Sequence, residues 1–402
     1  MSHRWFVCLL VVCTGVSSAL AEGPPLSLGR VVELARTQAP ATVIARARTE
    51  EARAGLVGAS RFATRNPVLE ADVGPRWSDG RSTDAQASLS VPLDLGGRRD
   101  KRVSLVEAEI RREQHLARDA ERLTIGIAVT TYYQALYADR RYALAEERVR
   151  LAESAEATAR QRNRAGDVAE FEVNLARGEV ARAKSGVAAA QSEQTRARGK
   201  LAVTLGLSSV SIVGELGDRS FLDIAVAKAG TRADLRAVAE EVQLAQSEAT
   251  VARSGRWPSL DVRFTYEHER DTDIVLGGIA IAIPLVERGQ GDEARARARA
   301  NRAAAELATR TAWVGTEVSG ARNTYASAIT AARILETDAV PLSLENETAA
   351  AASYRAGKID LGSLLLIRRE ALDTRREHLD RLLDAAFAAV DLWIARGTDP
   401  GP

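Results

Sequence analysis

The chain has 402 residues, with 55 lysines and arginines against 54 aspartates and glutamates, so its formal net charge is +1. Charges of both signs are mixed along its length, which argues against a general nucleic-acid or anionic-membrane surface. Aromatic residues make up only 4% of the chain, while alanine, arginine, glutamate and leucine are abundant. This composition is typical of long helices that pack through small side chains.

The N-terminus has the pattern of a secretory signal peptide over residues 1–21. Arg4 supplies a positive charge, an apolar stretch follows, and Ala19-Leu20-Ala21 forms a small-x-small cleavage site. A lipoprotein signal that uses Cys13 is the alternative. We therefore exclude residues 1–21 from the predicted fold.

Cleavage after Ala21 removes Cys8 and Cys13, the two cysteines of the chain. The mature protein is then expected to have neither disulfides nor thiolate metal sites. No later stretch has the ~18 consecutive apolar residues that a membrane helix needs. A mature protein that spans a membrane would therefore do so as a β-barrel.

The first half of the chain, residues 22–215, predicts a helix, two strands, a long helix, a break and a return helix. The expected ranges are 28–62 for the first helix, 67–77 and 85–95 for the strands, 98–163 for the long helix, 164–168 for the break and 168–205 for the return helix. Only Gly126, which a helix tolerates, interrupts the long helical stretch. At ~1.5 Å per residue this helix is about 100 Å long, far beyond a globular helix.

The second half, residues 216–402, repeats the same plan. The expected ranges are 233–254 for the first helix, 258–268 and 274–286 for the strands, 292–354 for the long helix, 355–359 for the break and 360–393 for the return helix. Pro341 is expected to kink or interrupt the long helix. Several landmarks recur in the same order and at nearly the same spacing: Pro67 and Pro258, the Pro-Leu pairs at 92–93 and 284–285, Tyr133 and Tyr325, and Arg-Ala-Gly at 164–166 and 355–357. This recurrence indicates an internal duplication.

The four predicted strands alternate apolar and polar residues with period two. In the third, Leu260, Val262 and Phe264 face one side and the charged residues between them face the other. Strands of about ten residues suit one tilted crossing of an outer membrane; a small amphipathic sheet on a soluble core is the alternative. Four strands cannot close a membrane barrel, because the smallest known have about eight. Three copies of the chain would supply 12.

The order of these features resembles the TolC family, the outer-membrane factors of bacterial tripartite efflux and type I secretion systems. The resemblance covers essentially the whole mature chain and rests on the duplicated plan, on "PLDLGGRR" (92–99) and "PLVERGQG" (284–291), and on "RAGDVAEFEVNL" and "RAGKIDLGSLLL" at the breaks. It implies a mainly α protein with duplicated halves. Its trimer would form a 12-stranded β-barrel, four strands per protomer, in the outer membrane, continued by a long α-helical barrel through the periplasm.

The resemblance also implies a function. The homotrimer would be the passive exit duct for substrate expelled by an inner-membrane pump, of the RND type, through a periplasmic membrane-fusion adaptor. "PLDLGGRR" is similar to the heavy-metal-efflux (CzcC-like) branch, which points to metal cations. The alternatives are a channel for drug efflux or type I protein secretion, and a periplasmic coiled-coil adaptor or scaffold.

In the family the two breaks are helix-hairpin tips at the far periplasmic end, where the channel meets its adaptor. The resemblance therefore assigns adaptor contact to two sets of residues: Arg164, Ala165, Gly166, Asp167 and Val168 in one tip, and Arg355, Ala356, Gly357, Lys358 and Ile359 in the other. Glycine suits such turns because it tolerates positive φ. A plain helix C-cap without a partner is the alternative interpretation.

Many family members place a carboxylate six residues after the tip glycine, around the periplasmic aperture. Glu172 holds that position in the first half, whereas the second half has Ser363 there, with Asp360 as a possible substitute. A solvated helix face is the alternative interpretation of Glu172. Trp77 and Trp257, at strand ends, are candidate membrane-interface anchors, with ordinary packing as the alternative. Leu365, Leu372, Leu379 and Trp393 follow a heptad spacing that predicts a coiled-coil seam.

The sequence contains no constellation typical of an enzyme. His115, His268 and His378 are scattered, and neither a nucleophile elbow nor a phosphate loop is present. No cluster of metal ligands is apparent and no cofactor is expected. The predicted partners are further copies of the chain, the adaptor, the pump and outer-membrane lipid, without nucleic acid.

Overall fold

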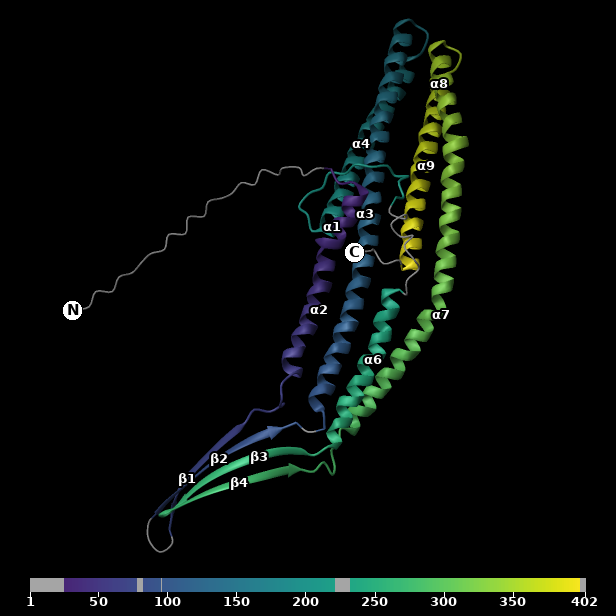
Figure 1. Ribbon diagram of the computed structural model, residues 1–402. Helices are drawn as coiled ribbons and strands as arrows, with labels where there is room; N and C mark the ends of the chain where they lie inside the picture. The colour runs from purple at the N-terminus through teal and green to yellow at the C-terminus, as the bar shows by residue number, and fades with distance from the viewer. Residues whose placement is uncertain (1–24, 78–81, 95, 221–231, 398–402) are drawn as a thin grey trace, which may run out of the picture.

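The computed structural model describes residues 25–77, 82–94, 96–220 and 232–397. The predicted signal peptide at 1–21 lies outside the described residues. Figure 1 shows an elongated molecule, in which a sheet lies at one end, long helices lead away from it, and two helix-hairpin tips lie at the opposite end. None of the described helices is both long and apolar enough to cross a membrane.

The elements of the first half are α1 (Leu28–Thr37), α2 (Pro40–Ala59), β1 (Val68–Arg76), β2 (Ser82–Leu93), α3 (Arg98–Arg164) and α4 (Glu170–Leu205). The prediction of a single helix over 28–62 is wrong, because the helical backbone is interrupted between α1 and α2. Pro40 disfavours helical backbone in the residue before it, and Ala39 accordingly has φ −57° and ψ 134°. β2 also differs from its expected range of 85–95, since it begins at Ser82 and ends at Leu93.

The elements of the second half are α6 (Ala233–Arg253), the 3₁₀ turn η1 (Ser254–Arg256), β3 (Ser259–Glu269), β4 (Thr272–Ala282), α7 (Gln290–Ile334), the π-helical turn η2 (Leu335–Ala339), α8 (Val340–Arg355) and α9 (Leu361–Arg396). The helix expected over 292–354 is therefore interrupted by η2 next to Pro341. This confirms the prediction that Pro341 would kink or interrupt it. Proline has no N–H to donate and crowds the preceding turn, and the wider π turn accommodates both effects.

β4 lies closer to the β3–β4 turn than its expected range of 274–286. Arg270 adopts a positive φ of 54°, which permits a tight turn, so the strands pair as far as Glu269 and Thr272. At the other end the strand stops at Ala282, two residues before Pro284, which cannot donate to a ladder.

The four strands form one antiparallel sheet in the order β1-β2-β3-β4, so β1 and β4 are its edges. The register aligns the apolar residues of neighbouring strands on one face. Val91 lies opposite Val262, which lies opposite Ile279. The next row toward the helices is Leu93, Leu260 and Ile281. One face of the sheet is therefore continuously apolar, as the period-two pattern predicted.

The main core lies where α1, α3 and α9 meet, midway between the sheet and the tips (Figure 1). Tyr132 and Tyr133 of α3 are almost fully buried there. The Tyr132 hydroxyl donates to the Val213 carbonyl at 2.8 Å, and the Tyr133 hydroxyl donates to the Asp218 carbonyl. Both bonds tie the connector after α4 to the long helix, and burial raises the pKa of Tyr132 to about 12.

Gly126 has a packing role that the sequence did not reveal. A Cβ at this position would lie 2.6 Å from Cδ1 of Ile394 in α9. The absence of a side chain therefore lets α3 and α9 approach closely in the core.

Candidate functional site at the hairpin tips

The two hairpin tips have the same backbone geometry. Gly166, after α3, has φ +83°, and Gly357, after α8, has φ +73°. In the first tip the Gly166 N–H donates to the Asn163 carbonyl at 3.0 Å and the Asp167 N–H donates to Arg162 at 2.9 Å. The second tip repeats both bonds with Gly357 to Tyr354 at 3.0 Å and Lys358 to Ser353 at 2.9 Å. Each is a Schellman motif, in which a left-handed glycine satisfies the last carbonyls of the helix.

The two tips differ in how the next helix begins. Asp360 is the N-cap of α9, and its carboxylate accepts from the Ser363 N–H at 2.6 Å. The corresponding N-cap of α4 is Ala169, which offers no side-chain bond. In that loop the Asn163 amide instead donates to the Val168 carbonyl at 2.9 Å. Asp360 is thus exposed at the tip, and its carboxylate also forms the N-cap hydrogen bond of α9.

A small apolar cluster joins the two hairpins just behind their tips. Tyr354 of α8 is 1% exposed and packs with Leu361 and Leu364 of α9 and with Val173 of α4. The guanidinium of Arg162, from the first hairpin, lies 5.1 Å from the centre of the Tyr354 ring. This contact is a cation–π interaction across the two hairpins, and it fixes the tips as a pair.

Glu172 takes part in this junction between the hairpins. Its side chain is half-buried, and its Oε2 atom is buried without a hydrogen-bond partner among the described residues. Burial raises the pKa of Tyr354, and the negative charge of Glu172 adds to that rise. In a single protomer, Glu172 therefore lies close to Tyr354 rather than on a free helix face, and its aperture role remains a prediction.

Arg162 and Tyr354 were not among the residues that the sequence pointed to. Each lies three or four residues before a tip glycine, on the last turn of its helix. An aromatic residue three positions before the glycine in only one of the two repeats was the available signal. The role of this aromatic residue depends on where the other hairpin lies, and the repeat pattern does not predict that position.

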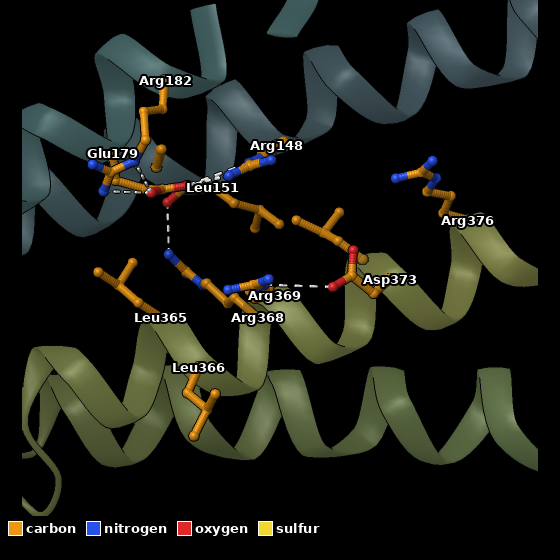
Figure 2. A pocket seen from close by; sticks show the side chains of 12 residues that line it. Arg148, Leu151, Glu179, Arg182, Leu365, Leu366, Arg368, Arg369, Asp373 and Arg376 are labelled. Atoms are coloured by element: carbon orange, nitrogen blue, oxygen red, sulfur yellow. Dashed lines mark hydrogen bonds and ion pairs between the residues drawn. The ribbon is translucent and has the colours of Figure 1, made fainter.

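A groove a few turns from the tips separates the first hairpin from α9. Figure 2 shows Glu179 of α4 between Arg148 and Arg182, with Arg368 reaching across from α9. The groove has a volume of about 640 Å³. Glu179 accepts from Arg148 at 2.7 Å and pairs with Arg182 at 2.9 Å. Although burial opposes it, these two arginines lower the pKa of Glu179.

Arg368 fastens α9 to α3 at this groove. Its side chain is buried, and its Nη1 donates to the Leu151 carbonyl at 2.6 Å. Burial lowers the pKa of Arg368, while the carboxylate of Glu347 opposes that shift. The predicted heptad seam lies along the same helix, with Leu365 packed in the tip cluster and Leu379 and Trp393 in the main core.

The polar face of the sheet is predominantly acidic. Arg76 and Arg263 are the basic residues that the strand register places on it. Its carboxylates are Glu70, Asp72, Asp84, Asp261, Glu267 and Glu269. Arg76 pairs with Asp84 at 2.7 Å and with Glu269 at 3.0 Å, so these charges gather near the loop end of the sheet.

The two candidate anchors lie at opposite ends of the sheet. Trp77 follows β1 at the loop end and is 79% exposed, whereas Trp257 precedes β3 at the helix end and is 57% exposed. The strands between them have about the length of one tilted membrane crossing. Their anchoring role remains a prediction.

Comparison with known proteins shows what the chain is similar to. Residues 31–207 match the model of the outer membrane efflux protein family. Over these residues the chain resembles this family. The chain is 24% identical over 335 residues to the cobalt-zinc-cadmium resistance protein CzcC of Cupriavidus metallidurans, with 81% of this chain and 80% of that protein covered. It is 27% identical over 339 residues to the nickel-cobalt-cadmium resistance protein NccC of Alcaligenes xylosoxydans xylosoxydans, with coverages of 81% and 74%.

The fold of the chain is similar to that of solved outer-membrane channels. The transmembrane channel CusC superposes with a TM-score of 0.74 at 18% identity, covering 94% of this chain and 95% of the other. The resemblance to the TolC family is therefore confirmed, and the similarity places the chain with outer-membrane channels.

Proposed function

We propose that three copies of the chain form the exit duct of a tripartite efflux system. The observation that carries this proposal is the four-stranded sheet, which is apolar on one face, polar on the other and open at β1 and β4. Open strand edges in lipid leave backbone groups unpaired, at a cost of several kcal/mol each. Pairing β4 of one copy with β1 of the next removes these edges and closes a 12-stranded barrel.

The helices then continue the barrel into the periplasm. The apolar face of each sheet contacts lipid, which leaves the polar face toward the lumen. The hairpin tips form the far periplasmic end, where residues 164–168 and 355–359 contact the adaptor. Glu172 and Asp360, with Ser363, border the aperture there. The chain passes substrate passively, and an inner-membrane pump supplies the energy.

Divalent heavy-metal cations are the substrate class that we favour. The two relatives are resistance proteins for cobalt, zinc, cadmium and nickel by name. The polar face of the sheet presents six carboxylates and two guanidinium groups, and three copies would surround one lumen with this excess of negative charge. A pore wall of this kind concentrates cations and repels anions.

The channel proposal is tested by fractionation and conductance. The mature protein should be extracted from the outer membrane by detergent as a trimer and should conduct ions across a planar bilayer. Under a salt gradient the reversal potential should report cation preference. The variant E70Q/D72N/E267Q should reduce that preference, and the charge-conserving control E70D/D72E/E267D should retain it.

A monomer that does not conduct would contradict the channel proposal. The substrate is tested separately in the native host. Loss of the gene should increase sensitivity to cadmium, zinc or cobalt while leaving tolerance to organic drugs unchanged. The opposite pattern would favour a drug-efflux duct, and loss of a secreted protein would favour type I secretion.

A further inference from the structure

Several arginines lie close together at the junction between the sheet and the helices. They give this region a local positive charge, although the net charge of the whole chain is only +1. Glu293, at the start of α7, has a side chain that is only 4% exposed and accepts from three guanidinium groups. These belong to Arg253 at 3.1 Å, Arg256 at 2.7 Å and Arg297 at 2.5 Å. One carboxylate therefore meets three positive charges at this point.

The excess charge of this arginine cluster is available to solvent. The side chains of Arg253, Arg256 and Arg297 are 51%, 54% and 61% exposed. Each guanidinium has five N–H donors, and Glu293 engages only some of them. Although burial opposes it, the arginines lower the pKa of Glu293, so the carboxylate stays ionised and the cluster keeps a net positive charge.

A groove next to this cluster combines arginine with exposed apolar side chains. Arg256 and Arg288 line it together with residues 283–286, and its volume is about 580 Å³. Ile283, Leu285 and Val286 are 66%, 70% and 86% exposed. The Arg288 guanidinium donates to the Leu285 carbonyl at 2.9 and 3.2 Å and has no carboxylate partner in the part of the chain that the structure describes.

The apolar part of the groove continues the apolar face of the sheet. Ile279 and Ile281 of β4 lie on that face, and Ile283 follows them in the same alternation. Trp257, exposed at the same end of the sheet, accepts a hydrogen bond at its carbonyl from Arg98. Arginine, tryptophan and a strip of aliphatic side chains at one level are the features of a membrane–water interface.

We propose that this groove, which we call the junction groove, binds an anionic phospholipid from the inner leaflet of the outer membrane. The phosphate lies between Arg256 and Arg288, and the start of an acyl chain lies along Ile283, Leu285 and Val286. This inference rests on the proposed function, because it requires the sheet to lie in the outer membrane. The lipid, rather than a free anion, is favoured by the aliphatic floor, which a free anion would leave exposed to water.

The experiment uses the full mature trimer in detergent and measures its melting temperature. Dioleoyl-phosphatidylglycerol, dioleoyl-phosphatidylcholine and inorganic phosphate are added in separate titrations. A ligand that binds the folded state raises the melting temperature with concentration. We expect phosphatidylglycerol to give a larger shift than phosphatidylcholine, inorganic phosphate to give none, and high salt to reduce the difference.

The variant R256Q/R288Q should abolish the preference for phosphatidylglycerol, with binding weaker by roughly tenfold or more. R256K/R288K keeps the positive charges and should retain most of the preference for phosphatidylglycerol. If R256Q/R288Q does not fold, the single variant R288Q replaces it in the test. R369Q/R376Q removes two arginines near the tips, far from the junction, and should behave as the wild type. An equal response of the wild type to both lipids, or an equal response to inorganic phosphate, would overturn the inference.

The two proposals fail in different ways. A trimer that conducts but does not distinguish the two lipids contradicts only the junction groove. A protein that neither trimerises nor conducts contradicts the proposed function, and it also overturns lipid binding in the junction groove, because that binding requires the sheet to lie in the outer membrane.

Discussion

At the scale of single residues, Gly166 and Gly357 determine where the long helices turn. Both have left-handed backbone, which costs an ordinary L-residue about 1–2 kcal/mol. A Cβ at Gly166 would meet no atom within 4 Å, and at Gly357 only the end of the Arg162 side chain at 3.8 Å. The requirement for glycine is therefore conformational rather than steric at both tips.

Replacing either tip glycine by alanine should destabilise its hairpin by about 1–2 kcal/mol, because alanine resists the left-handed backbone. G166N and G357N should cost less, since asparagine tolerates this conformation better. Melting temperature of the trimer and hydrogen exchange at residues 160–170 and 350–362 measure the effect.

The matched control is Gly186, in the interior of α4, where a Cβ also meets nothing within 4 Å. G186A should stabilise the protein by about 0.5–1 kcal/mol, because alanine is the better helix former. If G166A and G186A shifted stability in the same direction, the conformational argument for the tips would be wrong.

At the scale of elements, the start of α9 depends on the ionised carboxylate of Asp360. The backbone N–H of Ser363 donates to it, and this bond lowers the pKa of Asp360 below the usual 3.8. A lowered folded-state pKa means that the cap contributes stability above the unfolded pKa and that this contribution disappears as the pH falls through the folded pKa. The cap is therefore intact at neutral pH and lost only in acid.

The first turn of α9 should lose protection as the pH falls below about 4. Hydrogen–deuterium exchange of residues 361–366, corrected for the intrinsic exchange rate at each pH, measures this. D360N keeps an oxygen acceptor without a charge, so its protection should be independent of pH in this range. D360A should lack the protection at every pH, and the start of α4, capped by Ala169, should not respond. Equal acid sensitivity in the wild type and D360N would exclude Asp360 as the cause.

At the scale of the whole molecule, the two faces of the sheet have to meet different environments. Ile279 lies on the apolar face and is 68% exposed in the single chain. Ala280, the next residue of the same strand, lies on the polar face opposite Asp261. The two positions are therefore at nearly the same depth but on opposite sides of the barrel wall.

I279K should prevent stable insertion, because a lysine facing the hydrocarbon costs up to about 2–4 kcal/mol per copy. A280K should insert normally, because its side chain reaches the aqueous lumen beside Asp261. Outer-membrane fractionation and the yield of trimer in detergent measure both variants. Normal insertion of I279K together with loss of A280K would reverse the assignment of the two faces.

Much of this molecule was predictable because its signals are local or periodic. The period-two pattern around Leu260 and Val262 fixes which strand residues share a face, since side-chain alternation is a property of any strand. The repeated Arg-Ala-Gly at 164–166 and 355–357 predicts matched turns, because glycine suits a left-handed helix end wherever the helix lies. Proline likewise marks interruptions, as Pro341 did, although the break before Pro40 was missed.

Only the tertiary structure decided how distant segments combine. The sequence showed Gly126 only as a residue that a helix tolerates, and α9 then placed Ile394 against it. Glu172 was predicted at the aperture, with a solvated helix face as the alternative, and the second hairpin placed Tyr354 beside it. The arginines of the junction come from separate segments of a chain whose total charge is almost zero, and the fold brings them together around a single carboxylate. The backbone conformation at a turn depends on the residue type at that position, which the sequence gives directly. Burial and net local charge depend on which residues become neighbours in the fold, and the linear sequence does not specify these.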